Sequence, residues 1–278
     1  MVRIVSDTST LYSTQQAREA GFAVSPLSVT IAGNSYREFD DIDPERFVDL
    51  IRQGNLPTSS QPAVGDVVAL YQQFPEDEIL NISMAAGLSG TYHGAVAAAE
   101  LCGHSDRITV LNSRTLCGPH RYLVENAVRL AAAGLSRSEI VAATERLMKT
   151  AKSYLMPADF GYLRRGGRLS PLVSHMGQTM HLVPMMTQTE DSTQLTLAGI
   201  RRSFSQAVKH IAKTLEKWGV GENWRIYISH ADAQALADQA YRMLRDVFPA
   251  ATLEVLPLSP AFITQGGPGC VAIQVIHT

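Results

Sequence analysis

The chain has 278 residues, 45% hydrophobic and 18% charged, which is typical of a globular protein with room for one large domain or two ordinary ones. The formal net charge of −2 argues against nucleic-acid binding, which normally requires a basic excess on one face. Because no stretch approaches about 18 uninterrupted apolar residues, the sequence predicts no integral membrane association.

Strand-like and helix-like segments alternate through the first part of the chain. A β-rich run at Val2–Ser6 ends in a polar turn, and Asp43-Pro44-Glu45 has the N-cap, proline and acidic first turn that open a helix through Ile51. Short apolar strands separated by helices favour a parallel sheet with helices on both faces. The other predicted strands are Phe22–Val29, Ile79–Met84 and Ile108–Leu111, and the other predicted helices are Gly90–Leu101, Tyr122–Ala133 and Ser136–Ala151.

The pattern changes after about Tyr154, which predicts a second α/β domain. We expect residues 1–155 to form an N-terminal α/β domain and residues 156–278 a C-terminal α/β domain. Residues 163–168 are typical of a turn, and the methionines that follow either line an adaptable tunnel or fill an ordinary core. These methionines are Met176, Met180, Met185 and Met186; the predicted helices are Phe204–Leu215 and Gln234–Val247, and the predicted strands are Arg225–Ser229, Thr252–Leu256 and Val271–Ile276.

Common enzymatic signatures are absent from the sequence. It has no Walker-type phosphate loop and no GxGxxG after a strand, and Gly87-Leu88-Ser89-Gly90 is one residue short of a nucleophile elbow. The eight histidines lack metal-ligand spacing, and three scattered cysteines are too few for a disulfide framework or a zinc site. The N-terminus also lacks a signal-peptide pattern. We therefore expect a cytoplasmic protein with no catalytic residues, no metal and no cofactor.

Loops rich in hydroxyl groups and glycine stand near the ends of predicted strands. Hydroxyls and free backbone N–H groups at the carboxyl ends of parallel strands suit an anionic group such as a carboxylate or a phosphate. For any single loop, capping of the next helix is the simpler explanation, whereas four converging loops would form an anion site. The loops are Asp7-Thr8-Ser9, Thr58–Gln61, Ser89-Gly90-Thr91 and Gly266–Gly269.

These loops, in this order, resemble the DegV family over nearly the whole chain. The family has an Asp-Ser-Thr-like turn after its first strand, a Thr-Ser-Gln-Pro motif, a Leu-Ser-Gly-Thr-Tyr motif and a late His-x-Gly-Pro-Gly loop. Order and spacing together make the resemblance specific. The matching segments are Ile4–Ser9, Pro26-Leu27, Ser59–Pro62, Leu88–Tyr92, Asn112-Ser113, Tyr162–Arg168 and Gln265–Gly269.

The resemblance implies two α/β domains with one long-chain fatty acid held in a tunnel between them. It implies that Ser59 and Ser89 bind the carboxylate, while Ser60, Gly90 and Thr91 shape the same pocket. Arg201 matches a basic position near the head group in some members, and a solvated surface arginine is an equally good interpretation. The resemblance also implies a partner, a separate fatty acid kinase that phosphorylates the bound carboxylate.

Three positions depart from the family pattern. Ser59 stands where threonine is usual and keeps the hydroxyl, and Asn112 replaces an aspartate and removes a negative charge. Gln265 replaces the histidine of the Gly-Pro-Gly loop, and its amide can donate to a carboxylate without carrying a charge or shuttling a proton. Fatty acid binding is therefore the firmer expectation, and coupling to a kinase the weaker one.

The leading hypothesis is a lipid carrier that is not an enzyme. One alternative is an enzyme acting on the acyl carboxylate with Ser89 or Ser59 as nucleophile, although the sequence identifies no base to activate either serine. Another alternative is a regulatory protein that uses bound lipid as a structural plug. Ligand exchange, or transfer to a kinase, would distinguish a carrier from a plug.

Overall fold

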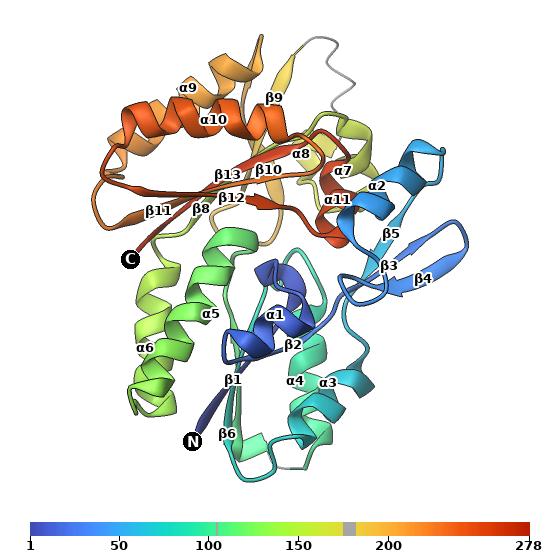
Figure 1. The fold of residues 1–278 in the computed structure, drawn as a ribbon, viewed down its shortest axis with the longest axis vertical. Helices are drawn as coiled ribbons and strands as arrows, with labels where there is room; N and C mark the ends of the chain where they lie inside the picture. Colours follow the sequence, from blue (N-terminus) through green and yellow to red (C-terminus); the bar gives the residue numbers. More distant parts are fainter. Residues whose placement is uncertain (104, 175–181) are drawn as a thin grey trace.

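The computed structural model describes residues 1–103, 105–174 and 182–278. They form two α/β units, each built on its own sheet, and a small additional sheet (Figure 1). In Figure 1 the parallel sheet lies in the lower half of the molecule and the larger mixed sheet in the upper half, with helix α5 (Cys117–Ala132) between them. The α/β class expected from the alternating pattern is confirmed.

The N-terminal sheet is parallel throughout and has the strand order β2-β1-β6-β7. Apolar clusters line both of its faces, because β1 and β6 contribute apolar side chains to each face. Helices α1, α5 and α6 cover one face, and α3 and α4 cover the other. The bounds are β1 Val2–Asp7, β2 Ala23–Ser25, β6 Glu78–Ser83, β7 Ile108–Asn112, η1 Thr8–Thr10, η2 Ser105–Arg107, α1 Thr14–Glu19, α3 Val64–Gln72, α4 Thr91–Leu101 and α6 Arg137–Met148.

The segment expected to form one strand over Phe22–Val29 forms two. Pro26 separates β2, which pairs with β1, from β3 (Ser28–Ile31), which belongs to a small antiparallel sheet of order β4-β3-β5. Proline lacks the N–H that a continuous ladder needs, so the chain changes sheets there. Strands β4 (Asn34–Arg37) and β5 (Thr58–Ser60) flank α2 (Pro44–Arg52), whose first turn is capped by Asp43 as expected.

The C-terminal sheet has six strands in the order β10-β9-β8-β13-β11-β12 and is antiparallel except between β11 and β12. Helices α9 and α10 cover one face over a large apolar cluster. The opposite face is turned toward α5 and α11. The bounds are β8 Lys152–Met156, β9 Val183–Gln188, β10 Leu195–Arg201, β11 Trp224–His230, β12 Thr252–Pro257, β13 Val271–His277, α7 Phe160–Gly166, α8 Pro171–Ser174, α9 Phe204–Lys217, α10 Gln234–Val247 and α11 Pro260–Gly266.

Two features near the middle of the chain refine the expectations. The proposed domain boundary at residue 155 falls within β8, which pairs with β13 and β9, so sheet membership favours a boundary before Lys152. The expected turn over residues 163–168 is wrong for its first four residues. Helix α7 continues through Gly166, and Gly167 ends it with a left-handed φ of 71°. Within the described ranges, no helix combines the length and the apolar character needed to cross a bilayer.

Candidate functional site

A pocket of about 280 Å³ lies where the small sheet, the β6–α4 loop and α11 meet. Strand β5 contributes Ser59 and Ser60, the β6–α4 loop contributes Ser89 and Gly90, and α11 contributes Gln265. The structure therefore brings five of the seven sequence-predicted ligand residues to one cavity from three distant segments. Its remaining lining residues are Leu27, Gln61, Met84, Leu88, Arg168, Ala261 and Phe262.

Hydroxyl and amide groups in this pocket are already oriented by one another. Gln265 Nε2 donates to Ser59 Oγ at 3.2 Å, and the hydroxyls of Ser89 and Thr91 lie 2.8 Å apart. The backbone N–H of Thr91 also points at Ser89 Oγ, at 3.3 Å. Thr91 is itself buried in the first turn of α4 and does not line the pocket, so it acts on the pocket through Ser89.

Two glycines lie directly against amide side chains of the pocket wall. A Cβ at Gly90 would lie 1.8 Å from Gln61 Oε1, and a Cβ at Gly166 would lie 2.0 Å from Gln265 Oε1. Each contact is with the end of a flexible side chain, so a Cβ at either position would displace the amide of Gln61 or Gln265 from its place at the pocket wall.

Arg168 is a pocket residue that the sequence analysis did not single out. Its Nε donates to the backbone oxygen of Leu88 at 3.1 Å, and its guanidinium also bonds the backbone oxygen of Gly166. Arg168 lines both this pocket and the apolar cavity beyond it, so it places a positive charge where an anionic group would sit. The sequence signal for this residue is the motif Tyr162–Arg168, although its composition is typical of a turn and does not mark the arginine as a ligand.

Arg201 lies elsewhere. It ends β10, where its guanidinium bonds the backbone oxygen of Ile200 and Nδ1 of His210 on α9. It lines neither the hydroxyl pocket nor the apolar cavity. We therefore exclude Arg201 from the proposed head-group site.

An apolar cavity of about 100 Å³ adjoins the pocket, between the two domains. Both spaces are lined by Arg168, Gln265 and three apolar side chains, so these five residues form the wall that the two spaces share. Cys117 also lines the cavity, and burial raises the pKa of its thiol, which keeps it neutral. The three shared apolar residues are Met84, Leu88 and Phe262.

The four methionines raised by the sequence have different places. Met186 lines the apolar cavity, whereas Met185 lies on the opposite face of the sheet, in the core under α9. Met176 and Met180 lie outside the described residues.

The loop Asp7-Thr8-Ser9 does not line the pocket but supports it from beneath. The Thr8 hydroxyl and the backbone N–H of Ala261, in the first turn of α11, both donate to the buried carboxylate of Glu38. Burial raises the pKa of Glu38 to about 7, and these hydrogen bonds oppose that rise. This group anchors the N-terminus of the helix that carries Phe262 and Gln265.

Asn112 keeps the acceptor role that an aspartate would have. Its Oδ1 receives hydrogen bonds from the backbone N–H groups of Ala86 and Arg114, at 3.1 and 3.0 Å. It thereby joins the loop that leads to Leu88 and Ser89 with the loop after β7. An amide oxygen makes both bonds without a negative charge near the interdomain space.

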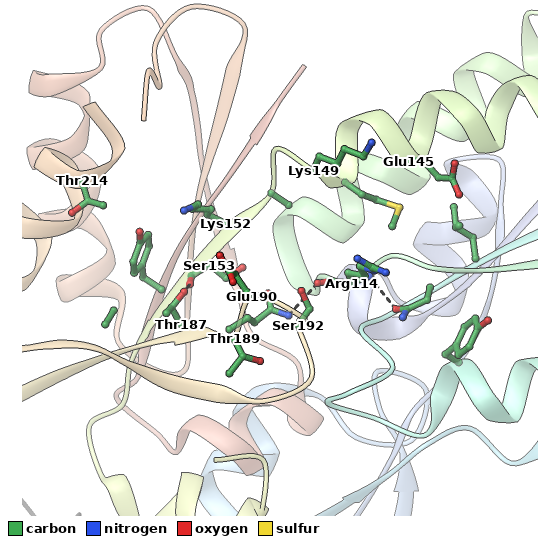
Figure 2. A pocket seen from close by; sticks show the side chains of 18 of the residues that line it. Arg114, Glu145, Lys149, Lys152, Ser153, Thr187, Thr189, Glu190, Ser192 and Thr214 are labelled. Atoms are coloured by element: carbon green, nitrogen blue, oxygen red, sulfur yellow. Dashed lines mark hydrogen bonds between the residues drawn. The ribbon is translucent and has the colours of Figure 1, made fainter. Parts of the chain in front are cut away.

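On its other side the apolar cavity meets a wide polar cleft of about 1000 Å³. Figure 2 looks into this cleft, with Glu145 of α6 and Lys149, which follows α6, on one side and Lys152, Ser153 and Thr187 on the other. Gln188 crosses between the domains and donates to the backbone oxygen of Arg114 at 3.1 Å. Among the described residues, no group of three histidine, cysteine or acidic side chains is arranged to hold a metal.

The fold and site define a class, a two-domain α/β protein whose hydroxyl-lined pocket opens into an apolar interdomain cavity. The family model described as "Uncharacterised protein, DegV family" matches residues 1–278, and the chain belongs to the DegV family. A DegV domain-containing protein of Staphylococcus aureus strain N315 is 27% identical over 276 residues, which cover 98% of both chains.

Two solved structures share this architecture. A DegV family protein from Thermus thermophilus, described for its fatty acid binding, superposes with a TM-score of 0.90 at 24% identity, over 100% of this chain and 99% of the other. DegV of Bacillus subtilis, described as a fatty acid binding protein, superposes with a TM-score of 0.88 at 25% identity over the same shares. The expected family and fold are confirmed.

Proposed function

We propose that this protein binds one long-chain fatty acid, with the carboxylate in the hydroxyl-lined pocket and the chain in the apolar interdomain cavity. The observation that carries the proposal is that the two spaces adjoin one another and share Arg168 and Gln265 in their lining. A polar, cationic end joined to an apolar passage matches a molecule with one anionic end and a long hydrocarbon tail. The description of the Bacillus subtilis relative as a fatty acid binding protein adds support.

The energetics of such binding are favourable. A palmitate tail has about fourteen methylenes, and burial of the whole tail at roughly 0.8 kcal/mol each would contribute about 11 kcal/mol before the costs of ordering and association. The cavity of about 100 Å³ must widen between the domains to admit it. Several kcal/mol remain, so a dissociation constant at or below about 1 μM is expected. The apolar cavity supplies affinity, while the pocket sets orientation, because an unpaired buried carboxylate is costly.

We assign the head-group contacts to Ser59, Ser89, Gln265 and Arg168. The two hydroxyls and the Gln265 amide donate hydrogen bonds, and Arg168 supplies the charge. Ser60 and Gly90 shape the exposed rim, and Thr91 orients Ser89.

The proposed role is binding rather than catalysis. Ser89 Oγ is paired with Thr91 Oγ1, and Ser59 Oγ with Gln265 Nε2, so neither serine is held by a general base. The exposed rim leaves the carboxylate within reach of a partner such as a fatty acid kinase, to which we propose that the protein presents its ligand. The cysteines Cys102, Cys117 and Cys270 are free thiols, which supports a cytoplasmic location.

The first test is mass spectrometry of the organic extract from natively purified protein, where we expect one C14–C18 fatty acid per chain. The second is oleate affinity in Ser59→Ala and Ser89→Ala. Each variant loses a hydrogen bond to a charged group, worth about 1.5–3 kcal/mol, so affinity falls roughly 10- to 150-fold. Ser138→Ala, on the exposed face of α6, is the matched control. An empty protein that takes up no added fatty acid would refute the proposal, and unchanged affinity in both variants would refute the assigned site.

A further inference from the structure

The floor of the apolar cavity is a row of side chains on three adjacent strands. Leu155 of β8 lies opposite Ala272 of β13 and opposite Met186 of β9 in the ladder register. All three line the cavity. This apolar row is on the side of β8 nearer to α7 and Arg168, where the head-group pocket lies.

The next row on the same face is polar. Side chains two residues apart on a strand share a face, about 7 Å apart. Ser153 lies opposite Gln274, and the register of β8 with β9 extended by one residue places Gln188 opposite Ser153. All three line the far part of the apolar cavity. We call Gln188, Ser153 and Gln274 the polar row.

Gln274 is fixed within this row. It is almost fully buried, and its Nε2 donates to Ser153 Oγ at 2.9 Å and to the backbone oxygen of Leu116 at 3.0 Å. Its Oε1 accepts from the backbone N–H of Gly118 at 3.3 Å. The Gln274 amide thus closes the cavity against the start of α5, and the row is left open on the side of Ser153 and Gln188.

That open side faces water. Ser153, Tyr154, Thr187 and Gln188 line both the apolar cavity and the wide interdomain cleft. In Figure 2, Ser153 and Thr187 lie on the cleft wall close to Lys152. The passage is therefore polar at both ends and apolar between them.

We propose that the polar row is a second polar subsite that receives the distal end of the acyl chain, so that the protein accepts long-chain acids with a hydroxyl at the ω-carbon. This rests on the proposed fatty acid function and specifies its ligand class. A terminal hydroxyl both donates and accepts, and the row offers the amide oxygen of Gln188 and the hydroxyl of Ser153. In a closed apolar tunnel the same hydroxyl would be buried without a partner, which lowers affinity by about 10-fold or more.

The test compares matched pairs of acids from C12 to C18, each with and without an ω-hydroxyl, by displacement of a fluorescent fatty acid. At the length that reaches the polar row, we expect the hydroxy acid to bind the parent protein within about 3-fold of the unsubstituted acid, or more tightly. For shorter pairs the hydroxyl stops in the apolar section, and the hydroxy acid binds at least 10-fold more weakly.

The double variant Ser153→Ala, Gln188→Leu makes the row apolar and leaves Gln274 in place. We expect its affinity for the hydroxy acid of the reaching length, taken relative to the unsubstituted acid of the same length, to be at least 10-fold lower than in the parent. Gln194→Leu, on the same hairpin but outside both spaces, is the control and should behave as the parent.

Discrimination of 10-fold or more against the hydroxy acid at every length in the parent would overturn the subsite. An unchanged pattern in the double variant would overturn it as well. Failure of the parent to bind any unsubstituted acid is a different result, because it removes the proposed function itself.

Discussion

The buried carboxylate of Glu38 makes the stability of the fold depend on pH. Glu38 lies beneath the head-group pocket, where it accepts hydrogen bonds from Thr8 and from the backbone N–H of Ala261 at the start of α11. Its side chain is fully buried, and nearby Asp7 adds a repulsive negative charge. Burial is the largest cause of the rise of its pKa to about 7 from an ordinary value of 4.5.

The direction of the effect follows from proton binding in the two states. Between pH 4.5 and about 7, the unfolded chain has released the Glu38 proton and the folded chain still holds it. The folded state binds more protons there, so the free energy of unfolding decreases as the pH rises through this window and is constant above it. At 1.36 kcal/mol per pKa unit, the loss is about 3 kcal/mol.

Glu38→Gln should remove this dependence, because the neutral amide imitates the protonated acid. The measurement is urea unfolding of the parent and the variant at pH 5 and pH 8. We expect the stability of the variant relative to the parent to rise by about 3 kcal/mol from pH 5 to pH 8. The exposed Glu222→Gln serves as a control and should track the parent. Parallel pH profiles for parent and Glu38→Gln would show that Glu38 is ionised in the folded protein at pH 5.

Three further outcomes are expected. Arg168→Gln should weaken oleate binding about 10- to 100-fold, because a charged donor is lost, whereas Arg201→Gln should leave the dissociation constant unchanged. Gly118→Ala should lower the free energy of unfolding in urea by about 1–3 kcal/mol, because its Cβ would lie 2.2 Å from Cγ of the buried Tyr227 ring. Asp43→Ala should cost about 1 kcal/mol by the same assay through loss of the α2 N-cap, and Asp43→Asn should restore most of it.

The N-terminal sheet was predictable because its strands are buried on both faces. Continuous apolar runs separated by helices have few other solutions, and the expected strand Ile79–Met84 is found as β6 with nearly the same bounds. The six-stranded sheet was harder. Its central strand β13 is buried on both faces, so the sequence showed a buried strand without showing that its neighbours run antiparallel.

The small sheet was missed because its strands are short and largely polar. Strand β5 contains Thr58, Ser59 and Ser60, which has the composition of a loop. Its pairing with β3 is what fixes Ser59 next to Gln265 of α11. The motif therefore predicted residues that line the pocket, while the element that positions them came only from long-range pairing.

Arg168 and Arg201 show why charge alone could not locate the head group. Arg168 ends the motif Tyr162–Arg168 and Arg201 ends the strand β10. The residues around each arginine give no sign of which one lies near an anionic group. In the fold, Arg168 follows the Gly166-Gly167 turn, and a Cβ at Gly166 would collide with Gln265, so this backbone approaches the pocket closely. Arg201 instead ends β10 next to His210, on the side of the sheet covered by α9. The bond from Arg168 to the backbone oxygen of Leu88 holds the motif arginine at the pocket.

The polar row illustrates a property that no single segment of the sequence contains. Along β8, Ser153 and Leu155 differ by one step of the two-residue strand period, and the same step separates Gln274 from Ala272 and Gln188 from Met186. Taken alone, any one of these pairs is an ordinary change from an apolar to a polar side chain on one face of a strand, near its end. Only the registers of β8 with β13 and β9 align the three polar residues in one row and the three apolar residues in the next.

A shift of one residue in either register would turn that strand's side chains to the opposite face and break the row. The depth at which the passage changes from apolar to polar is therefore set by strand pairing in the C-terminal sheet, independently of the loops that form the head-group pocket.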